Sequence, residues 1–162
     1  MRHWRWDLAV MVSGVAGLAA VGTVQADPSV PPSTPEAVVR QAVLANERRD
    51  LEGMSQLFLK DPDIVSYGTM GLKFVGWTDL EQALRAEFQA VKRLEIAIKE
   101  LKVWTREDVA WFSMELDYMR VLPGPQGETR MLMELCETGV LERRGGRWLF
   151  HGWHESFRRP RL

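Results

Sequence analysis

The sequence predicts an α+β fold, with about three N-terminal helices packed on an antiparallel sheet. Its apolar residues recur with a helical period up to about residue 91, apart from one short strand. From residue 94 to residue 157 they recur with a period of two, which is typical of strands. Helices followed by long strands indicate an α+β fold rather than alternating βαβ units. The length of 162 residues suits one domain.

Composition excludes several classes of function. The chain has 46% hydrophobic residues, 27% charged residues and a formal net charge of −1. No basic field therefore favours nucleic acid as a partner. The single cysteine, Cys136, rules out an intrachain disulfide and a cysteine-based zinc site. Two histidines lie beyond residue 26, and the glycines at 145 and 146 suit a hairpin rather than a phosphate-binding loop. We therefore expect neither a metal nor a cofactor.

Residues 1–26 have the features of a secretory signal peptide. A positively charged start precedes an uncharged run over residues 8–24, and Val24 and Ala26 are the small residues that a signal peptidase requires. We expect cleavage near Ala26 and export, either to the periplasm or out of the cell. The mature chain should have no stable membrane insertion, although an uncleaved anchor is the alternative. Residues 27–33, with three prolines, should form an extended leader.

Local signals place the helices in order. Thr34 can cap a first helix, and Asp50 can cap a second, shorter one. A short strand at residues 64–67 follows, because it is apolar and bounded by Pro and Gly. Thr78 and Glu81 have the spacing of a capping box, which predicts the start of a third helix.

Four long strands are predicted after the helices. They cover residues 94–104, 109–121, 129–141 and 147–157, separated by turns rich in Gly, Pro and charged residues. The domain should therefore span residues 34–157, and residues 158–162 should form a solvated basic tail.

The last strand carries large apolar side chains on both faces. By simple alternation, Trp148 and Phe150 point one way, while Leu149, Trp153 and Phe157 point the other. A sheet buried on both faces needs helices on one face and another layer on the other. We expect a second copy of the chain to supply that layer, giving a homodimer through the sheet.

Several segments carry a family resemblance. They are Asp-Val-Ala-Trp-Phe-Ser at 108–113, Thr-Gly-Val-Leu-Glu-Arg-Arg-Gly-Gly-Arg-Trp at 138–148, Gly-Trp at 76–77 and His-Glu-Ser at 154–156. With these segments in their order along the chain, residues 34–157 resemble the SnoaL-like branch of the nuclear transport factor 2-like superfamily. The resemblance implies a strongly curved sheet wrapped around the helices, forming a cone with an internal apolar pocket and commonly dimerising through the sheet. It implies no single activity, because the superfamily includes isomerases, dehydratases, cyclases, ligand carriers and assembly domains.

Tyr67 is the first candidate catalytic residue. Steroid-isomerase-like members place an acidic base on the strand after the second helix, and the resemblance aligns that position with Tyr67. A tyrosine with an ordinary pKa near 10 cannot act as a carboxylate base at neutral pH. Its hydroxyl could still donate a hydrogen bond to a substrate carbonyl.

His154 and Glu134 are the other two candidates. His154 lies late in the last strand, where many relatives also carry His, and could move a proton. Glu134 shares a strand face with Leu132 and Cys136, and an apolar lining would raise its pKa and make it a general acid. The alternatives are a structural histidine at the sheet rim and an ion pair between Glu134 and an arginine.

The ligand-binding candidates are aromatic and methionine side chains. We expect Trp77, Phe88, Trp111, Met114 and Met133 to line the pocket. Spaced aromatic residues and methionines also build cores and dimer interfaces, and this alternative stays open.

Three functions follow as hypotheses. The first is an exported SnoaL-like domain that binds a small apolar or amphipathic molecule in a conical pocket. The second is a cofactor-independent lyase, isomerase or hydrolase, in which His154 or Glu134 moves a proton and Tyr67 polarises a carbonyl. The third is a dimeric assembly domain whose sheet face matters more than its pocket.

Overall fold

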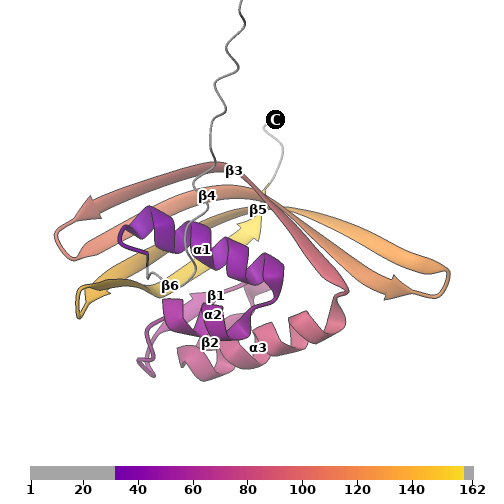
Figure 1. The fold of residues 1–162 in the computed structure, drawn as a ribbon, viewed down its shortest axis with the longest axis horizontal. Coiled ribbons are helices and arrows are strands. Elements are labelled where there is room, and N and C mark those ends of the chain that lie inside the picture. The colour runs from indigo at the N-terminus through magenta and orange to yellow at the C-terminus, as the bar shows by residue number, and fades with distance from the viewer. Residues whose placement is uncertain (1–31, 159–162) are drawn as a thin grey trace, which may run out of the picture. The chain divides into compact units, whose positions relative to one another are not determined.

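The computed structural model describes residues 32–158 and shows helices packed on one sheet (Figure 1). The predicted signal peptide lies outside the described residues, as do most of the leader and of the basic tail. The three helices are α1 (Pro35–Arg48), α2 (Leu51–Leu57) and α3 (Gly76–Ala90). Among the described residues, no helix is long and apolar enough to cross a membrane.

Six strands form the sheet, in the order β2-β1-β6-β5-β4-β3. They are β1 (Val65–Tyr67), β2 (Lys73–Val75), β3 (Arg93–Arg106), β4 (Val109–Gly124), β5 (Gly127–Arg144) and β6 (Arg147–Phe157), with a 3-10 turn η1 (Thr69–Gly71) between β1 and β2. The α+β class with three helices is confirmed. The sheet is mixed, however, because β1 pairs parallel with β6 while the other neighbours are antiparallel. The long connection between β1 and β6 allows that parallel pairing. The strong curvature of the sheet stays a prediction.

Side-chain caps begin the first two helices as predicted. The Thr34 hydroxyl accepts a hydrogen bond from the Ala37 N–H at 3.2 Å, and the Asp50 carboxylate accepts one from the Gly53 N–H at 2.8 Å. The third helix differs, because it begins at Gly76 and Thr78 lies within its first turn. The predicted capping box is therefore absent at that end.

The helices lie on one face of the sheet, which we call the inner face (Figure 1). Their buried stripes pack against apolar residues of the long strands and form one core. It includes Val38, Val39, Ala42, Met54 and Leu80 from the helices and Phe112, Met114, Leu116, Leu135, Leu141 and Phe150 from the strands.

A bulge in β6 changes which side chains face the helices. Val140 pairs with Gly152 but Leu141 pairs with Phe150, so His151 is an extra residue in β6. After the bulge, Trp153 lies on the inner face together with Phe150. The predicted alternation placed Trp153 and Phe150 on different faces of the sheet. It is therefore wrong beyond residue 150.

Candidate functional site

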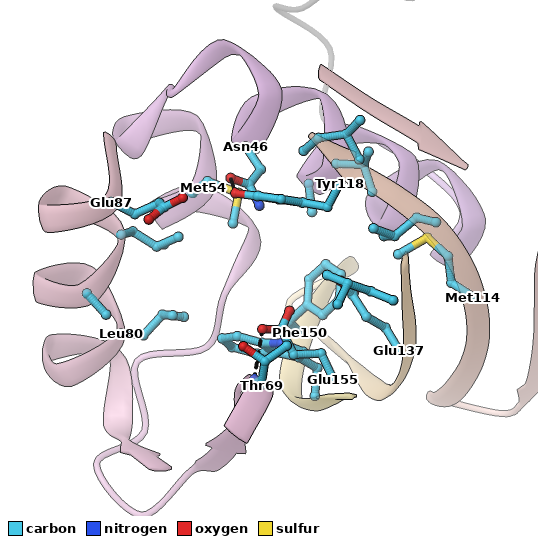
Figure 2. Close-up of a pocket in the computed structure, with 18 of the residues that line it drawn as sticks. Asn46, Met54, Thr69, Leu80, Glu87, Met114, Tyr118, Glu137, Phe150 and Glu155 are labelled. Atoms are coloured by element: carbon cyan, nitrogen blue, oxygen red, sulfur yellow. Dashed lines mark hydrogen bonds between the residues drawn. The ribbon is translucent and has the colours of Figure 1, made fainter. Parts of the chain in front are cut away.

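A cavity of about 290 Å³ lies between the helices and the inner face of the sheet (Figure 2). Apolar side chains from α1, α2, α3 and strands β2 to β6 form most of its wall. The polar residues that line it are Asn46, Thr69, Glu87, Tyr118, Arg120, Glu137 and Glu155. A mainly apolar cavity with a few polar groups is typical of a small-molecule site.

Two glutamates lie side by side in this wall. Glu137 on β5 and Glu155 on β6 are direct partners in the strand register, and both side chains face the cavity (Figure 2). Directly opposed residues in an antiparallel pair have Cβ atoms about 5 Å apart. The two carboxyl groups can therefore contact the same group of a bound molecule.

The two carboxyl groups differ in their surroundings. Burial, and secondarily the negative charge of Glu155, raises the pKa of Glu137 to about 8. Glu137 has no hydrogen-bond or ion-pair partner within residues 32–158. Burial also raises the pKa of Glu155, but Glu155 accepts a hydrogen bond of 3.0 Å from the Thr69 N–H, which opposes the shift. At neutral pH, Glu137 therefore holds a proton, whereas the hydrogen bond from Thr69 favours the ionised form of Glu155.

A second set of polar side chains lies across the cavity, on α3 and β4. The Arg120 guanidinium and the Glu87 carboxylate form an ion pair at 2.5 Å. The Tyr118 hydroxyl donates to Asn46 Oδ1 at 3.4 Å, and burial raises the pKa of Tyr118. Because Glu87 neutralises Arg120, this guanidinium is not a free anion-binding group.

The pattern of the SnoaL-like domain family matches residues 36–160, which is most of the chain. The chain belongs to the SnoaL-like family. This confirms the resemblance found in the sequence, and no curated protein matches the chain.

Solved structures share the fold of this SnoaL-like domain at low sequence identity. A candidate dehydratase of the nuclear transport factor 2-like family from Streptomyces avermitilis aligns with a TM-score of 0.71 and 15% identity, covering 77% of this chain and 94% of that one. A nuclear transport factor 2-like superfamily protein from Salmonella enterica aligns with a TM-score of 0.67 and 12% identity, covering 76% of this chain and 87% of that one. A ketosteroid isomerase-like protein from Erwinia carotovora aligns with a TM-score of 0.62 and 20% identity, covering 77% of this chain and 94% of that one. These likenesses show the fold alone.

Two of the three predicted catalytic residues of the SnoaL-like domain come together outside the cavity. Tyr67 and His154 are partners in the register of β1 and β6, and their rings lie 6.0 Å apart. Tyr67 is 42% exposed, and His154 is also exposed. The bulge at His151 explains this, because it leaves Trp153 and Glu155 facing the cavity instead of His154.

Glu134, the third predicted catalytic residue, also lies away from the cavity. It shares β5 with Glu137, but an odd separation puts the two side chains on opposite faces. Glu134 forms an ion pair with Arg158 at 2.5 Å, and Arg158 also binds Glu115 at 2.8 Å. The three predicted catalytic residues therefore do not converge on one bound atom.

The predicted ligand-binding residues divide in the same way. Met114 and Met133 line the cavity. Trp77 packs against Phe58, with ring centroids 5.4 Å apart, and the Lys60 ammonium lies 3.4 Å from the centre of its ring. Trp111 lies on the outer face of the sheet, and Phe88 lines a separate depression with Arg48 and Arg49. Within residues 32–158, no group of three or more His, Cys, Asp or Glu side chains is placed to hold a metal ion.

Sequence reasoning missed Glu137 and Glu155. The available signal was the alternation of Met133, Leu135, Glu137, Gly139 and Leu141 along one face of β5, in which a carboxylate interrupts apolar positions. Glu155 carried no such signal, because the bulge that turns it inward has no distinctive residue pattern.

Proposed function

We propose that this SnoaL-like domain binds a small, mainly apolar molecule that carries one polar group. The unpartnered Glu137 carboxyl in an apolar cavity carries this proposal. Such a group is unfavourable unless water or a ligand supplies a hydrogen bond. A ligand that fills the cavity would bury its apolar part against the core and satisfy Glu137 at the same time.

A cavity-filling variant tests the proposal. Ala83 lines the cavity from α3, whereas Ala86 is exposed on the same helix. The neutral fluorescent probe N-phenyl-1-naphthylamine should bind the wild-type protein with an increase in emission. Ala83→Phe should weaken its binding about tenfold or more, because one aromatic side chain removes much of the free volume. Ala86→Phe is the matched control. Equal probe binding by all three proteins would show that the cavity is not the binding site.

A second candidate function is acid–base catalysis on the bound molecule without a cofactor. The adjacent Glu137 and Glu155, which differ in their hold on a proton, favour it. Glu137 would donate a proton and Glu155 would accept one, in place of the proton transfer that the sequence predicts for His154 or Glu134. Two similar folds described as a candidate dehydratase and a ketosteroid isomerase-like protein agree with such chemistry.

Deuterium exchange tests this second candidate. A panel of cyclic ketones in D₂O should incorporate deuterium next to the carbonyl in the presence of the protein, as followed by NMR. Glu155→Gln should abolish the exchange, because an amide cannot accept the proton. Exchange that persists in Glu155→Gln would assign the base to another residue.

We also propose that the chain is exported and cleaved near Ala26. The uncharged run at 8–24 and the small residues before Asp27 support this. The mature protein recovered from the periplasm or medium should begin at Asp27 by mass spectrometry. Ala26→Asp should retain the unprocessed mass, because a charged side chain does not suit the cleavage position.

A further inference from the structure

One end of the cavity is acidic. Glu137 from β5 and Glu155 from β6 face it together (Figure 2). Among residues 32–158, Arg120 supplies the one guanidinium of the cavity wall, and it is paired with Glu87. From the other elements, η1 contributes the Thr69 N–H and α1 contributes the neutral Asn46. His154 lies close enough to favour ionised Glu155, but from the outer face. Within the described part of the chain, no positive side chain pairs with Glu137.

Aromatic rings surround the same cavity. Phe112, Phe150 and Trp153 belong to its wall, and Phe112 meets Phe150 edge-on, with centroids 5.8 Å apart and an interplanar angle of 86°. Two carboxyl groups beside aromatic rings suit an organic cation, because the ring faces attract positive charge and the carboxylates accept its N–H bonds.

We propose that the cavity selects molecules that carry a protonated amine, held between Glu137 and Glu155 with the apolar remainder against Phe112 and Phe150. This inference rests on the proposed binding function and names its ligand class. An ammonium group has three donors, so it can satisfy both carboxyl groups at once. A carbonyl or ether oxygen can accept from protonated Glu137, but its lone pairs then face the acceptor oxygens of Glu155. The pair therefore favours a donor over an acceptor.

Binding of the amine moves a proton. The ligand enters as R–NH₃⁺, protonated Glu137 becomes a carboxylate, and the proton of Glu137 goes to the solvent. No covalent bond forms, and one proton leaves for each amine bound. The release is close to complete below the pKa of Glu137 and disappears above it, where Glu137 is already ionised.

Isothermal titration calorimetry tests the inference with a matched pair of probes, 1-naphthylmethylamine and 1-naphthalenemethanol. At about pH 6.5, the amine should bind the wild-type protein at least tenfold more tightly than the alcohol. Its binding enthalpy should change with the ionisation enthalpy of the buffer, corresponding to nearly one proton released. At about pH 8, where half of the free Glu137 is already ionised and the amine is still mostly protonated, the proton release should fall to about half.

Two variants assign the effect to the glutamate pair. Glu137→Gln should lose the proton release and weaken amine binding about tenfold, while its binding of the alcohol shows that the cavity is intact. Glu142→Gln is the matched control, because Glu142 is on the same strand but binds Arg144 away from the cavity. Equal affinity for amine and alcohol without proton release would overturn the amine assignment and leave the proposed binding function standing. Failure of both probes and of N-phenyl-1-naphthylamine to bind would overturn both.

Discussion

Glu137 binds a proton more tightly in the folded chain than in the unfolded chain, because burial raises its pKa from 4.5 to about 8. Between these two values, the folded state keeps the proton while the unfolded state has lost it. The free energy of unfolding must then fall as the pH rises, by up to about 1.4 kcal/mol per pH unit from this one group. The contribution is fully present below about pH 4.5 and is lost once the pH passes about 8.

Glu137→Gln should remove this pH dependence. The glutamine amide is uncharged at every pH, so the wild-type protein and the variant should have similar stability near pH 5. By pH 8 the variant should be more stable by about 2 to 4 kcal/mol. Urea unfolding of both proteins across this range measures the difference. Parallel stability profiles would show that Glu137 titrates with an ordinary pKa.

The ion pair of Glu87 and Arg120 connects α3 to β4, and its loss should weaken that connection. Each side chain is 25% exposed, and the Arg120 Nε is buried without a partner among the described residues. Glu87→Gln should lower the free energy of unfolding by about 1 to 3 kcal/mol, because the guanidinium loses its counter-charge. Adding Arg120→Met should cost less than the sum of the two single changes.

Urea unfolding of the two single variants and the double variant completes this cycle. Arg85→Met is the control, because Arg85 and Glu81 form an exposed pair on the same helix. Its effect should stay within about 0.5 kcal/mol. Strict additivity of the Glu87 and Arg120 changes would mean that the pair contributes nothing to the packing of α3 on the sheet.

Gly139 allows β4 and β5 to bring Phe112 into the cavity wall. A Cβ atom at Gly139 would lie 2.4 Å from Phe112 Cε1 and 2.8 Å from the Gly152 carbonyl oxygen. Gly139→Ala should therefore displace the Phe112 ring and lower stability by about 1 to 3 kcal/mol. Thermal unfolding measures this loss, and adding Phe112→Leu should recover part of it. A neutral Gly139→Ala would show that the ring has room to move.

Sequence patterns were sufficient for the first two helices and the four long strands. The caps at Thr34 and Asp50 and the period-two strands depend on local chemistry, which a sequence displays directly. The parallel pairing of β1 with β6 and the short strand β2 depend on contacts between distant segments. The three-residue strand β2 (Lys73–Val75) is too short to show a period, so it was absent from the prediction.

The site was harder to predict because it depends on which face of each strand points inward. One extra residue in β6 turns Glu155 into the cavity and leaves His154 outside. On β5, the sequence prediction assigned Glu134, on the even-numbered face, to the pocket, whereas the inner face carries Glu137. Met114 and Met133 lie in the cavity wall as expected, since apolar residues of the inner face contribute to it. The expected site therefore differs from the observed cavity in which face of each strand points inward, not in the kinds of residue involved.

At the scale of the whole molecule, the helices within residues 32–158 leave the outer face of the sheet uncovered, and this face carries apolar residues. Trp104 and Trp111 stack there with centroids 6.3 Å apart. The exposed Val140 on β5 is the register partner of Trp111, and the exposed Val109 lies two residues before Trp111 on β4. We propose that a second copy of the chain covers this face. Large aromatic side chains with low conformational entropy are the usual centre of such interfaces.

Trp111→Glu should convert the dimer to a monomer. Trp111 is 43% exposed on the outer face, so a carboxylate there would be buried without a partner in the dimer but solvated in the monomer. Sedimentation velocity should show a dimer for the wild-type protein and a monomer for the variant, with unchanged circular dichroism. Leu44→Glu is the matched control, because Leu44 is 40% exposed on α1, on the helical side, and should leave the dimer intact. A wild-type monomer, or a Trp111→Glu dimer, would remove the outer face as the interface. Dissociation by both variants would instead indicate an interface that includes α1.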